Sequence, residues 1–295
     1  MERTPIIRPH ITPFEDSRRW EHVSYRPGDI VIATPPKCGT TWTQRIVMSL
    51  LWPDDDTPGG RGELSPWVDV RVLPIEELAE RLAGQQHRRF IKTHSPADAI
   101  PLDPDVRYVV VYRGAADALV SWGNHRATMR SEAVEMLNSR AAPDGIEGVP
   151  LTFHGDYNEL LVEWTAYWSP AIHLAPWWPL RHEPNVHLMH YRDMDADLSA
   201  EMARLAGFLD IDVPAERWHD TVERCRLDAM RTEAQNAGFN TMLFSGGAES
   251  FYYKGGVGRG RQLLTEAQLD AVADHVAARL PADAQAWLES GGPVP

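Results

Sequence analysis

The sequence predicts an α/β fold, a single domain with a mainly parallel central β-sheet flanked by helices and a nucleotide-binding site like that of P-loop proteins. Strand-like and helix-like segments alternate along the 295 residues, which favours a parallel sheet. Residues 106–112 are almost continuously apolar, as in a strand buried on both faces. Residues 34–42 connect a strand-like run to a helix-like run.

Composition limits the classes of function. Hydrophobic residues make up 43% of the chain, enough for a sizeable core, and the formal net charge is −13. That charge argues against nucleic acid or an anionic membrane surface as the main partner. No apolar run approaches the roughly 20 residues that span a bilayer. The chain contains two cysteines and shows no signal peptide, so a cytoplasmic location is expected.

Four short runs rich in apolar and β-branched residues predict the strands. Each run is followed by a proline, a glycine or a charged residue that interrupts the pattern. The predicted strands are 29–33, 89–94, 106–112 and 186–191.

Apolar residues at helical spacing predict the helices. The predicted helices are 44–52, 75–82, 115–129, 157–168, 196–209, 215–223, 227–232 and 266–280. Segments with Gly and Pro but little periodicity predict loops at 53–66, 140–152 and 235–262. The whole chain, 1–295, is expected to be one domain, with an N-terminal segment at 1–28. The last of the loops, 235–262, is long enough to indicate a functional loop.

The turn after the first predicted strand has the features of a phosphate site. A helix that starts there presents free N–H groups and the positive end of its dipole to an anion. Lys37 adds a charge, Thr40 and Thr41 add hydroxyl donors, and Gly39 permits close approach of the backbone. The lysine precedes the glycine, so this is not a standard P-loop. The alternative is a tight turn with an incidental lysine.

Two further groups follow predicted strands. Arg113 ends the strand 106–112, and Ser121 follows eight residues later. An arginine at the carboxyl end of a parallel strand can grip a phosphate through two hydrogen bonds, although an ion pair with Asp117 is the alternative. Lys92 and His94 end the strand 89–94. A histidine there can act as a general base or can be a packed structural residue.

A glycine-rich basic segment lies near the C-terminus. Residues 254–261 read Lys-Gly-Gly-Val-Gly-Arg-Gly-Arg. Basic side chains on a pliable backbone can fold over a phosphate. A flexible surface loop is the equal alternative.

In this order, the segments resemble those of the cytosolic-type sulfotransferases, which use 3′-phosphoadenosine 5′-phosphosulfate (PAPS). The resemblance covers about residues 28–270. Residues 36–42 are similar to the family's 5′-phosphosulfate loop, 113–121 to its 3′-phosphate motif, and 92–94 to its Lys-Thr-His motif. Residues 191–194, Leu227–Met230 and 251–265 are similar to its nucleotide-side and closing segments.

The resemblance implies a role for each matching residue. His94 is expected to be the catalytic base, and Lys37 and Lys92 are expected to be catalytic as well. The residues expected to bind PAPS are Lys37, Cys38, Gly39, Thr40, Thr41, Trp42, Arg113, Ser121, Tyr191, Leu227, Lys254 and Gly255. No metal is expected. The family also forms homodimers through a segment that would fall at 261–270 here.

Some residues depart from the family pattern. Cys38 stands where serine is usual, and a thiol at a helix N-terminus predicts a lowered pKa and sensitivity to alkylation. Tyr253 replaces an arginine, and Leu227 replaces an aromatic residue, which leaves Trp42 as the expected ring beside the adenine. Glu266 replaces a valine in the dimer segment.

The predicted function is sulfuryl transfer from PAPS to a hydroxyl or amine of a small acceptor. An apolar or amphipathic acceptor is expected, because aromatic residues fall in the variable segments. These residues are Phe14, Trp20, Trp67, Phe153, Phe239, Phe244 and Phe251. The alternative for them is that the rings anchor loops to the core. Two other functions remain open at this point, a small-molecule kinase and a non-catalytic nucleotide-binding protein.

Overall fold

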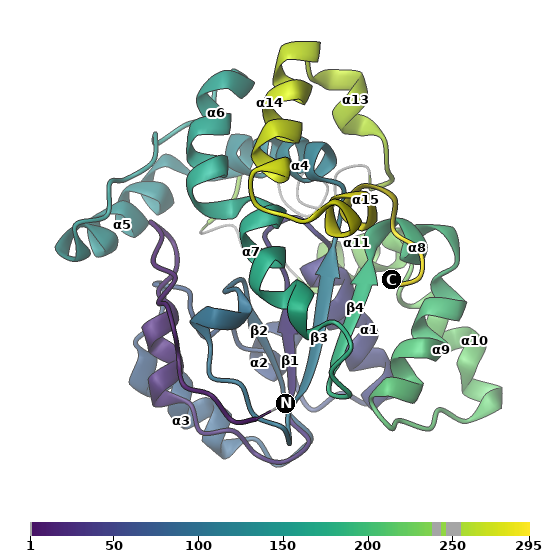
Figure 1. Cartoon of the computed structure of the whole chain (residues 1–295). Helices are drawn as coiled ribbons and strands as arrows, with labels where there is room; N and C mark the ends of the chain where they lie inside the picture. The colour runs from purple at the N-terminus through teal and green to yellow at the C-terminus, as the bar shows by residue number, and fades with distance from the viewer. Residues whose placement is uncertain (1, 238–242, 246–254) are drawn as a thin grey trace.

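Four parallel strands form the centre of the structure, a computed structural model that describes residues 2–237, 243–245 and 255–295 (Figure 1). The strands are β1 (Ile30–Ala33), β2 (Phe90–Thr93), β3 (Arg107–Tyr112) and β4 (Val186–His190). Their order across the sheet is β2-β1-β3-β4, and every neighbouring pair is parallel. The α/β fold with a parallel central sheet is therefore confirmed.

Helices cover both faces of this sheet because successive strand residues point to opposite sides. Val31 and Val110 face one core, and Ile30 and Val109 face the other. The first core is completed by α4 (Ala115–Thr128), α7 (Pro170–Trp177), α14 (Glu266–Ala277) and α15 (Ala282–Ser290). The second is completed by α1 (Thr40–Leu51), α9 (Leu198–Phe208) and α10 (Ala215–Glu223).

Shorter elements connect and flank these layers. The remaining α-helices are α2 (Arg61–Leu64), α3 (Ile75–Gly84), α5 (Ser131–Ala141), α6 (Tyr157–Glu163), α8 (Tyr191–Ala196), α11 (Leu227–Ala237) and α13 (Arg259–Leu263). A π-helix, Trp164–Trp168, extends α6. Short 3-10 turns occur at Ser17–His22, Ala97–Ala99, Ala142–Asp144 and Trp178–Leu180.

Six of the described helices were not expected from the sequence: α2, α5, α7, α8, α13 and α15. Helix α7 begins at Pro170, where the Ser169 side chain caps the backbone N–H of Ala171, and it contains Pro176. Apolar residues occupy most of its positions, so its sequence carries no amphipathic period to mark it. Helix α15 follows Pro281 at the end of the chain.

Several predicted boundaries are wrong, and two of them have a clear cause. The strand expected over 186–191 ends at His190, because the His190 ring accepts the N–H of Arg192 and caps α8, which starts at Tyr191. The loop expected over 235–262 is shorter, because α11 continues to Ala237 and α13 begins at Arg259.

The N-terminal segment is tied to the sheet through a second segment. Residues 67–70 run beside β2, with Lys92 N–H donating to the Pro66 carbonyl at 2.9 Å and Val68 N–H to the Lys92 carbonyl at 3.2 Å. Asp16 N–H donates in turn to the Asp69 carbonyl at 2.8 Å. The chain near residue 15 is thereby held close to the edge of the sheet.

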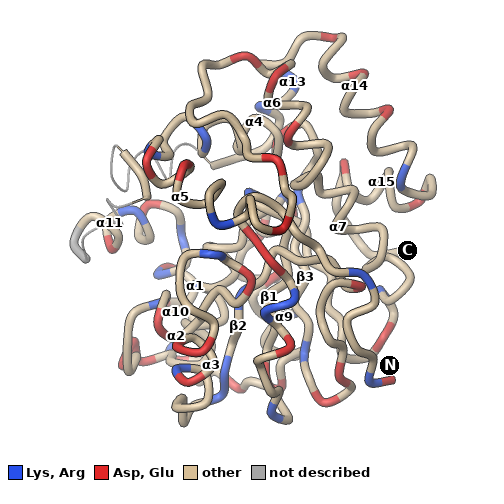
Figure 2. The backbone as a smooth tube through the Cα atoms, turned by 90° about the vertical axis from the view of Figure 1, so that its left-hand side faces the viewer, with Lys and Arg blue, Asp and Glu red and all other residues tan. Residues whose placement is uncertain are grey.

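Acidic and basic residues are interspersed over the molecule (Figure 2). The net charge of −13 therefore does not come from one acidic segment, and it leaves room for local groups of cations. None of the described helices is both long and apolar enough to cross a membrane.

Candidate active site

The site lies at the carboxyl edge of the sheet, at the point where the strand order reverses. β1 has β2 on one side and β3 on the other, and open α/β sheets bind ligands in the crevice at such a point. Helix α1 begins immediately after β1, with Gly39 as its N-cap. The residues after β1, β2 and β3 are therefore brought together beside a helix N-terminus, which attracts anions.

The loop between β1 and α1 is held in an unusual backbone conformation. Gly39 has a φ of 109°, and a Cβ added there would lie 3.3 Å from the Tyr191 ring. Lys37 has a φ of 68°, which is uncommon for a residue with a side chain. The Thr34 and Thr40 hydroxyls are hydrogen-bonded across the loop. Strain of this kind concentrates in functional loops.

Cys38 corrects one expectation. The side chain is fully buried rather than exposed at the helix N-terminus. Burial raises the pKa of its thiol to about 12, although Arg113 and Lys37 favour the thiolate. The predicted lowering of the Cys38 pKa is therefore wrong, and a buried neutral thiol offers little to an alkylating reagent.

Two cationic side chains approach the loop. Burial lowers the pKa of Lys37 to about 8, and the nearby Arg113 adds to this effect. The Lys37 Nζ lies 3.4 Å from the Nδ1 of His125 on α4. Bringing two positive charges together in a buried region costs energy unless an anion joins them. The arrangement therefore suits a negatively charged ligand.

Arg113 is the second cation, and a backbone loop covers it. Its side chain is buried, its Nη2 donates to the Gly256 carbonyl at 2.6 Å, and its Nε has no hydrogen-bond partner within the described part of the chain. The Asp117 carboxylate accepts the N–H groups of Gly258 and Gly260 at 2.8 and 2.7 Å. Asp117 thus holds the glycine loop and does not pair with the arginine, so the ion-pair alternative is wrong.

The residues expected beside the adenine lie together. The Trp42 and Tyr191 rings meet edge to face with centroids 5.2 Å apart. A Cβ on Gly255 would lie 2.9 Å from the Leu227 side chain and 3.4 Å from the Tyr191 hydroxyl oxygen. The Arg113 guanidinium lies over the Tyr191 ring, 4.5 Å from its centroid. These contacts form one wall that combines aromatic and cationic groups.

His94 is held in one orientation. Its Nδ1 donates to the Thr34 carbonyl at 2.6 Å, and its backbone N–H donates to the Asp69 carboxylate at 3.1 Å. A carbonyl only accepts, so Nδ1 carries the proton and Nε2 of the neutral ring has the lone pair. Burial lowers the pKa of His94 well below its usual range, and Lys92 strengthens this effect. At neutral pH the ring is therefore ready to accept a proton.

Lys92 lies beside Trp67. Its Nζ is 3.6 Å from the centroid of the Trp67 ring, a cation–π contact. Burial lowers the pKa of Lys92 to about 7, while the nearby Asp69 and Glu15 oppose that change. The Trp67 ring also meets the His94 ring edge to face at 4.8 Å. Trp67 therefore contacts both Lys92, near the end of β2, and His94, which follows β2.

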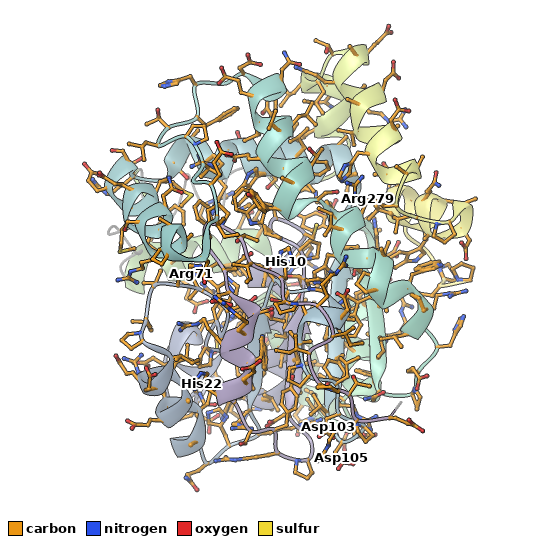
Figure 3. All side chains as sticks on the ribbon, turned by 60° about the vertical axis from the view of Figure 1, so that its left-hand side comes forward. His10, His22, Arg71, Asp103, Asp105 and Arg279 are labelled. Carbon is orange, nitrogen blue, oxygen red and sulfur yellow. The ribbon has the colours of Figure 1, made fainter. Side chains whose placement is uncertain are left out.

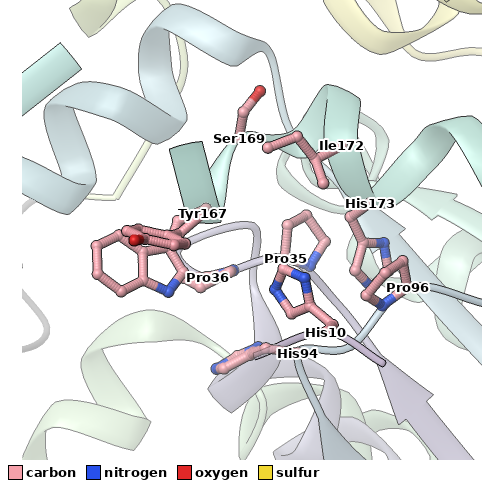
Figure 4. A pocket seen from close by; sticks show the side chains of 10 residues that line it. His10, Pro35, Pro36, His94, Pro96, Tyr167, Ser169, Ile172 and His173 are labelled. Carbon is pink, nitrogen blue, oxygen red and sulfur yellow. The ribbon is translucent and has the colours of Figure 1, made fainter. Parts of the chain in front are cut away.

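A cavity opens beside His94 (Figure 4). Its inner part, about 10 Å³, adjoins His94 and His173, which is room for about one water molecule. Its outer part, about 270 Å³, lies between the N-terminal segment and the π-helix. Both parts are lined by His10, Pro96, Tyr167 and Ile172, so the two cavities adjoin one another and are together called the passage, with the smaller one next to His94.

The aromatic residues expected around an acceptor fall into two groups. Phe14 and Trp20 are buried in the core, and Phe14 packs on Trp168 with centroids 5.0 Å apart. For these two, the expectation of a pocket wall is wrong and the anchoring alternative is right. Trp67 contacts the site, and Phe244 lies 4.8 Å from the His125 ring. Phe239, Phe251 and Tyr253 lie outside the described residues.

The remaining expected site residues are Thr41, Ser121 and Lys254. Thr41 is in the first turn of α1, and Ser121 is half-buried on α4. Lys254 lies outside the described residues. The described residues contain no group of three or more His, Cys, Asp or Glu side chains that could hold a metal ion.

Sequence reasoning missed two residues at the site, Asp69 and His125. Asp69 precedes His94 by 25 positions in a segment without a recognisable pattern. His125 is one of 12 histidines and shows no distinctive spacing. The positions of the lysines do mark the site. The 29 basic residues include only three lysines, Lys37, Lys92 and Lys254, and all three fall in the segments assigned to the site.

Comparison with known proteins gives a consistent result. The sequence model of the sulfotransferase domain matches residues 27–283. A glycolipid sulfotransferase of Mycobacterium bovis is 35% identical over 94% of this chain and 92% of its own. Sulfotransferase 1A1 of Bos taurus is 24% identical over 91% and 86% of the two chains.

Solved structures share the fold. A mouse sulfotransferase complexed with PAP has a TM-score of 0.69 at 18% identity, covering 92% of this chain and 91% of the other. Retinol dehydratase, solved with androsterone and the inactive cofactor PAP, has a TM-score of 0.68 at 19% identity, covering 91% and 87%.

Proposed function

Since this chain belongs to the sulfotransferase family, it is a sulfotransferase, and we propose that its donor is PAPS and its acceptor an amphipathic hydroxyl compound. The observation that carries the donor assignment is the buried Nε of Arg113, which has no partner among the described residues, beside the Lys37 loop. A buried guanidinium with an unused donor suits a phosphate oxygen. The structural relatives solved with PAP support the same donor.

Each of the three catalytic residues has its own role in sulfuryl transfer. His94 Nε2 takes the proton of the acceptor hydroxyl as the acceptor oxygen attacks sulfur. The bond from sulfur to the 5′-phosphate oxygen breaks, and adenosine 3′,5′-bisphosphate leaves. Lys37 stabilises the charge that develops on that bridging oxygen, and Lys92 stabilises the transferring group. Positioned charges of this kind supply most of the rate in the related phosphoryl transfers.

The 3′-phosphate assignment has a direct test. We expect Arg113→Ala to weaken binding of adenosine 3′,5′-bisphosphate by roughly 10- to 100-fold, because a charge-assisted hydrogen bond contributes about 1.5–3 kcal/mol. Adenosine 5′-phosphate, which lacks the 3′ group, should lose far less. Thermal-shift titration measures both, since a ligand that binds only the folded state raises the melting temperature.

The same titration separates the kinase alternative. ATP with magnesium should raise the melting temperature of the wild-type protein less than adenosine 3′,5′-bisphosphate without metal. Equal losses for the two adenosine nucleotides in Arg113→Ala would remove Arg113 from the 3′-phosphate site. A larger shift with ATP and magnesium would contradict the donor assignment itself.

The passage beside His94 supports an amphipathic acceptor. Its outer part carries Pro9, Ile11, Ala166 and Ile172 as apolar walls, whereas the part next to His94 admits about one water-sized group. A hydroxyl fits the narrow end, and an apolar body fits the wide end. The name of the Mycobacterium bovis relative points to the same class, a hydroxyl on a glycolipid.

Acceptor choice can be measured with a sulfur-labelled donor. We expect a glycolipid to be sulfated with a kcat/KM roughly tenfold or more above that of its free sugar, because each CH₂ that becomes buried contributes about 0.8 kcal/mol. Sterols and simple phenols complete the panel. Equal kcat/KM for the glycolipid and the free sugar would show that the outer passage does not hold the acceptor.

Three further aspects of the function are proposals as well. Free buried cysteines support a reducing, cytoplasmic setting. We also propose that residues 1–295 work as one domain, in which 255–262 close over the nucleotide. A homodimer through 261–270 remains a prediction, which light scattering in solution can test, and Glu266 in place of valine argues against that surface.

A further inference from the structure

Two buried carboxylates, Asp69 and Glu15, lie beside the C-terminal end of β2. Asp69 is fully buried and Glu15 is 1% exposed. Backbone pairing brings them together, because Glu15 is bridged to Val70 and Asp16 N–H donates to the Asp69 carbonyl. Neither carboxylate belongs to a motif found in the sequence, and neither has a role in the mechanism above.

Asp69 binds the turn that carries His94. Its Oδ2 accepts hydrogen bonds from the Thr93 hydroxyl at 2.9 Å, the His94 backbone N–H at 3.1 Å and the Ser95 hydroxyl at 2.8 Å. Three donors on one oxygen favour the ionised carboxylate. The other oxygen, Oδ1, is buried without a hydrogen-bond partner in the described part of the chain. Burial raises the pKa of Asp69, and these three hydrogen bonds oppose that change.

Lys92 lies beside the segment that carries Asp69. Trp67, two residues before Asp69, is paired with Lys92 and carries the Lys92 ammonium over its ring. Asp69 follows Trp67 by two residues, after a bend at residues 68 and 69, and bonds the hydroxyl of Thr93, the residue next to Lys92. Asp69 and Glu15 favour the charged form of Lys92, whereas Lys37 and Arg61 disfavour it. His94 is a further titratable group close to Lys92.

Glu15 differs from Asp69 in its partners. Its Oε2 accepts a longer hydrogen bond from the Thr12 hydroxyl, at 3.3 Å, and the Trp168 side chain is a second, weaker donor near it. Burial and the neighbouring Asp69 charge raise the pKa of Glu15 to about 8. Burial raises the pKa of both carboxylates, but the three hydrogen bonds to Asp69 favour its ionised form, so Glu15 is the member of the pair that keeps the proton. Lys92, Asp69 and Glu15 then carry one negative charge and, below the Lys92 pKa of about 7, one positive charge.

We propose that Asp69 is a positioning residue for sulfuryl transfer: its carboxylate fixes the Thr93–Ser95 turn that carries His94, and its charge keeps the Lys92 ammonium protonated, while Glu15 stays neutral behind it. This inference rests on the proposed function for its catalytic consequence. Its electrostatic part concerns the protein alone.

The electrostatic part can be tested without turnover. Only Lys37, Lys92 and Lys254 carry lysine amines in this chain, so trace acetylation with peptide mass spectrometry follows each one against pH. The midpoint for Lys92 in the wild-type protein should lie near pH 7. In Asp69→Asn it should move to lower pH by roughly one pH unit or more, because an opposite charge nearby shifts a pKa by about 1–3 units.

Two other variants complete this test. Glu15→Gln should move the Lys92 midpoint less than Asp69→Asn, because neutral Glu15 contributes little charge. Asp103→Asn is the matched control, a buried aspartate near the lower end of the molecule in Figure 3 that bonds Arg3 and Asp105. It should leave the midpoint unchanged. If Asp69→Asn does not fold, Asp69→Ser removes the same charge with a smaller side chain.

Turnover gives the second readout. The basic limb of the kcat/KM profile in Asp69→Asn should move to lower pH together with the Lys92 midpoint, so that activity falls further at pH 8 than at pH 6. A Lys92 midpoint that stays at its wild-type value in folded Asp69→Asn overturns the inference. Wild-type protein that transfers no sulfate to any acceptor would instead contradict the proposed function, and the acetylation result would still stand.

Discussion

His94→Ala lowers kcat by roughly 10²- to 10⁴-fold, the usual contribution of a general base, and leaves binding of adenosine 3′,5′-bisphosphate close to that of the wild-type protein. The reason is that the His94 lone pair at Nε2 acts on the acceptor, whereas the nucleotide is held by other residues. The low pKa of the buried ring keeps it neutral at pH 7. Transfer of labelled sulfate measures kcat, and a thermal-shift titration measures nucleotide affinity.

The control for this variant is His182→Ala. His182 is exposed and lies before β4, at the opposite end of the sheet from the site, so it should leave both quantities unchanged. His94→Ala also loses the hydrogen bond to Thr34, and its melting temperature must therefore be recorded. Near-normal turnover in folded His94→Ala would exclude His94 as the base.

Lys37→Met lowers kcat by roughly 10²- to 10³-fold, the range seen when one group that stabilises transition-state charge is removed. The charge on the bridging oxygen grows as the bond to sulfur breaks, so the ammonium contributes more in the transition state than in the ground state. Affinity for adenosine 3′,5′-bisphosphate should fall by less than kcat. Methionine keeps the apolar stem at a position where φ is 68°.

Arg181→Met is the matched control, since the chain has no lysine outside the site segments. Arg181 pairs with Asp283 and contacts Trp178 at a distance from the loop, and its loss should not change turnover. If Lys37→Met lost affinity and kcat by the same factor, Lys37 would bind the nucleotide equally in both states. Its assignment to the leaving group would then be wrong.

Most of the fold could be predicted because local patterns carried it. The four strands were recognisable from apolar, β-branched runs, and α1, α4 and α10 were recognisable from helical spacing. Helix α7 was not, because it is apolar on most sides and shows no period. Tyr191 was placed in a strand because its neighbours are apolar, whereas the capping of α8 by His190 involves a side chain whose role only the folded chain reveals.

The candidate site was likewise predictable only in part. Lys92 lies near the end of β2, and Lys37, His94 and Arg113 follow strands. Parallel strands end at one edge of the sheet, so the convergence of these residues followed from topology. The state of Cys38 did not follow, because a thiol at a helix N-terminus is activated only when it faces the N–H groups and solvent. In the structure the Cys38 side chain is fully buried.

The sequence by itself determined the order of elements, the phosphate-binding character of the loop after β1 and the family. Those features depend on residues close together in the chain, whose spacing is visible without a structure. Only the tertiary structure decided which groups surround each catalytic side chain. Asp69 bonds His94, which is 25 positions later in the chain, and Lys37 lies beside His125, 88 positions later. Asp117 bonds Gly258 and Gly260 and does not pair with Arg113. Burial then sets the charges of Lys92, His94 and Cys38, because the cost of leaving water depends on the whole fold.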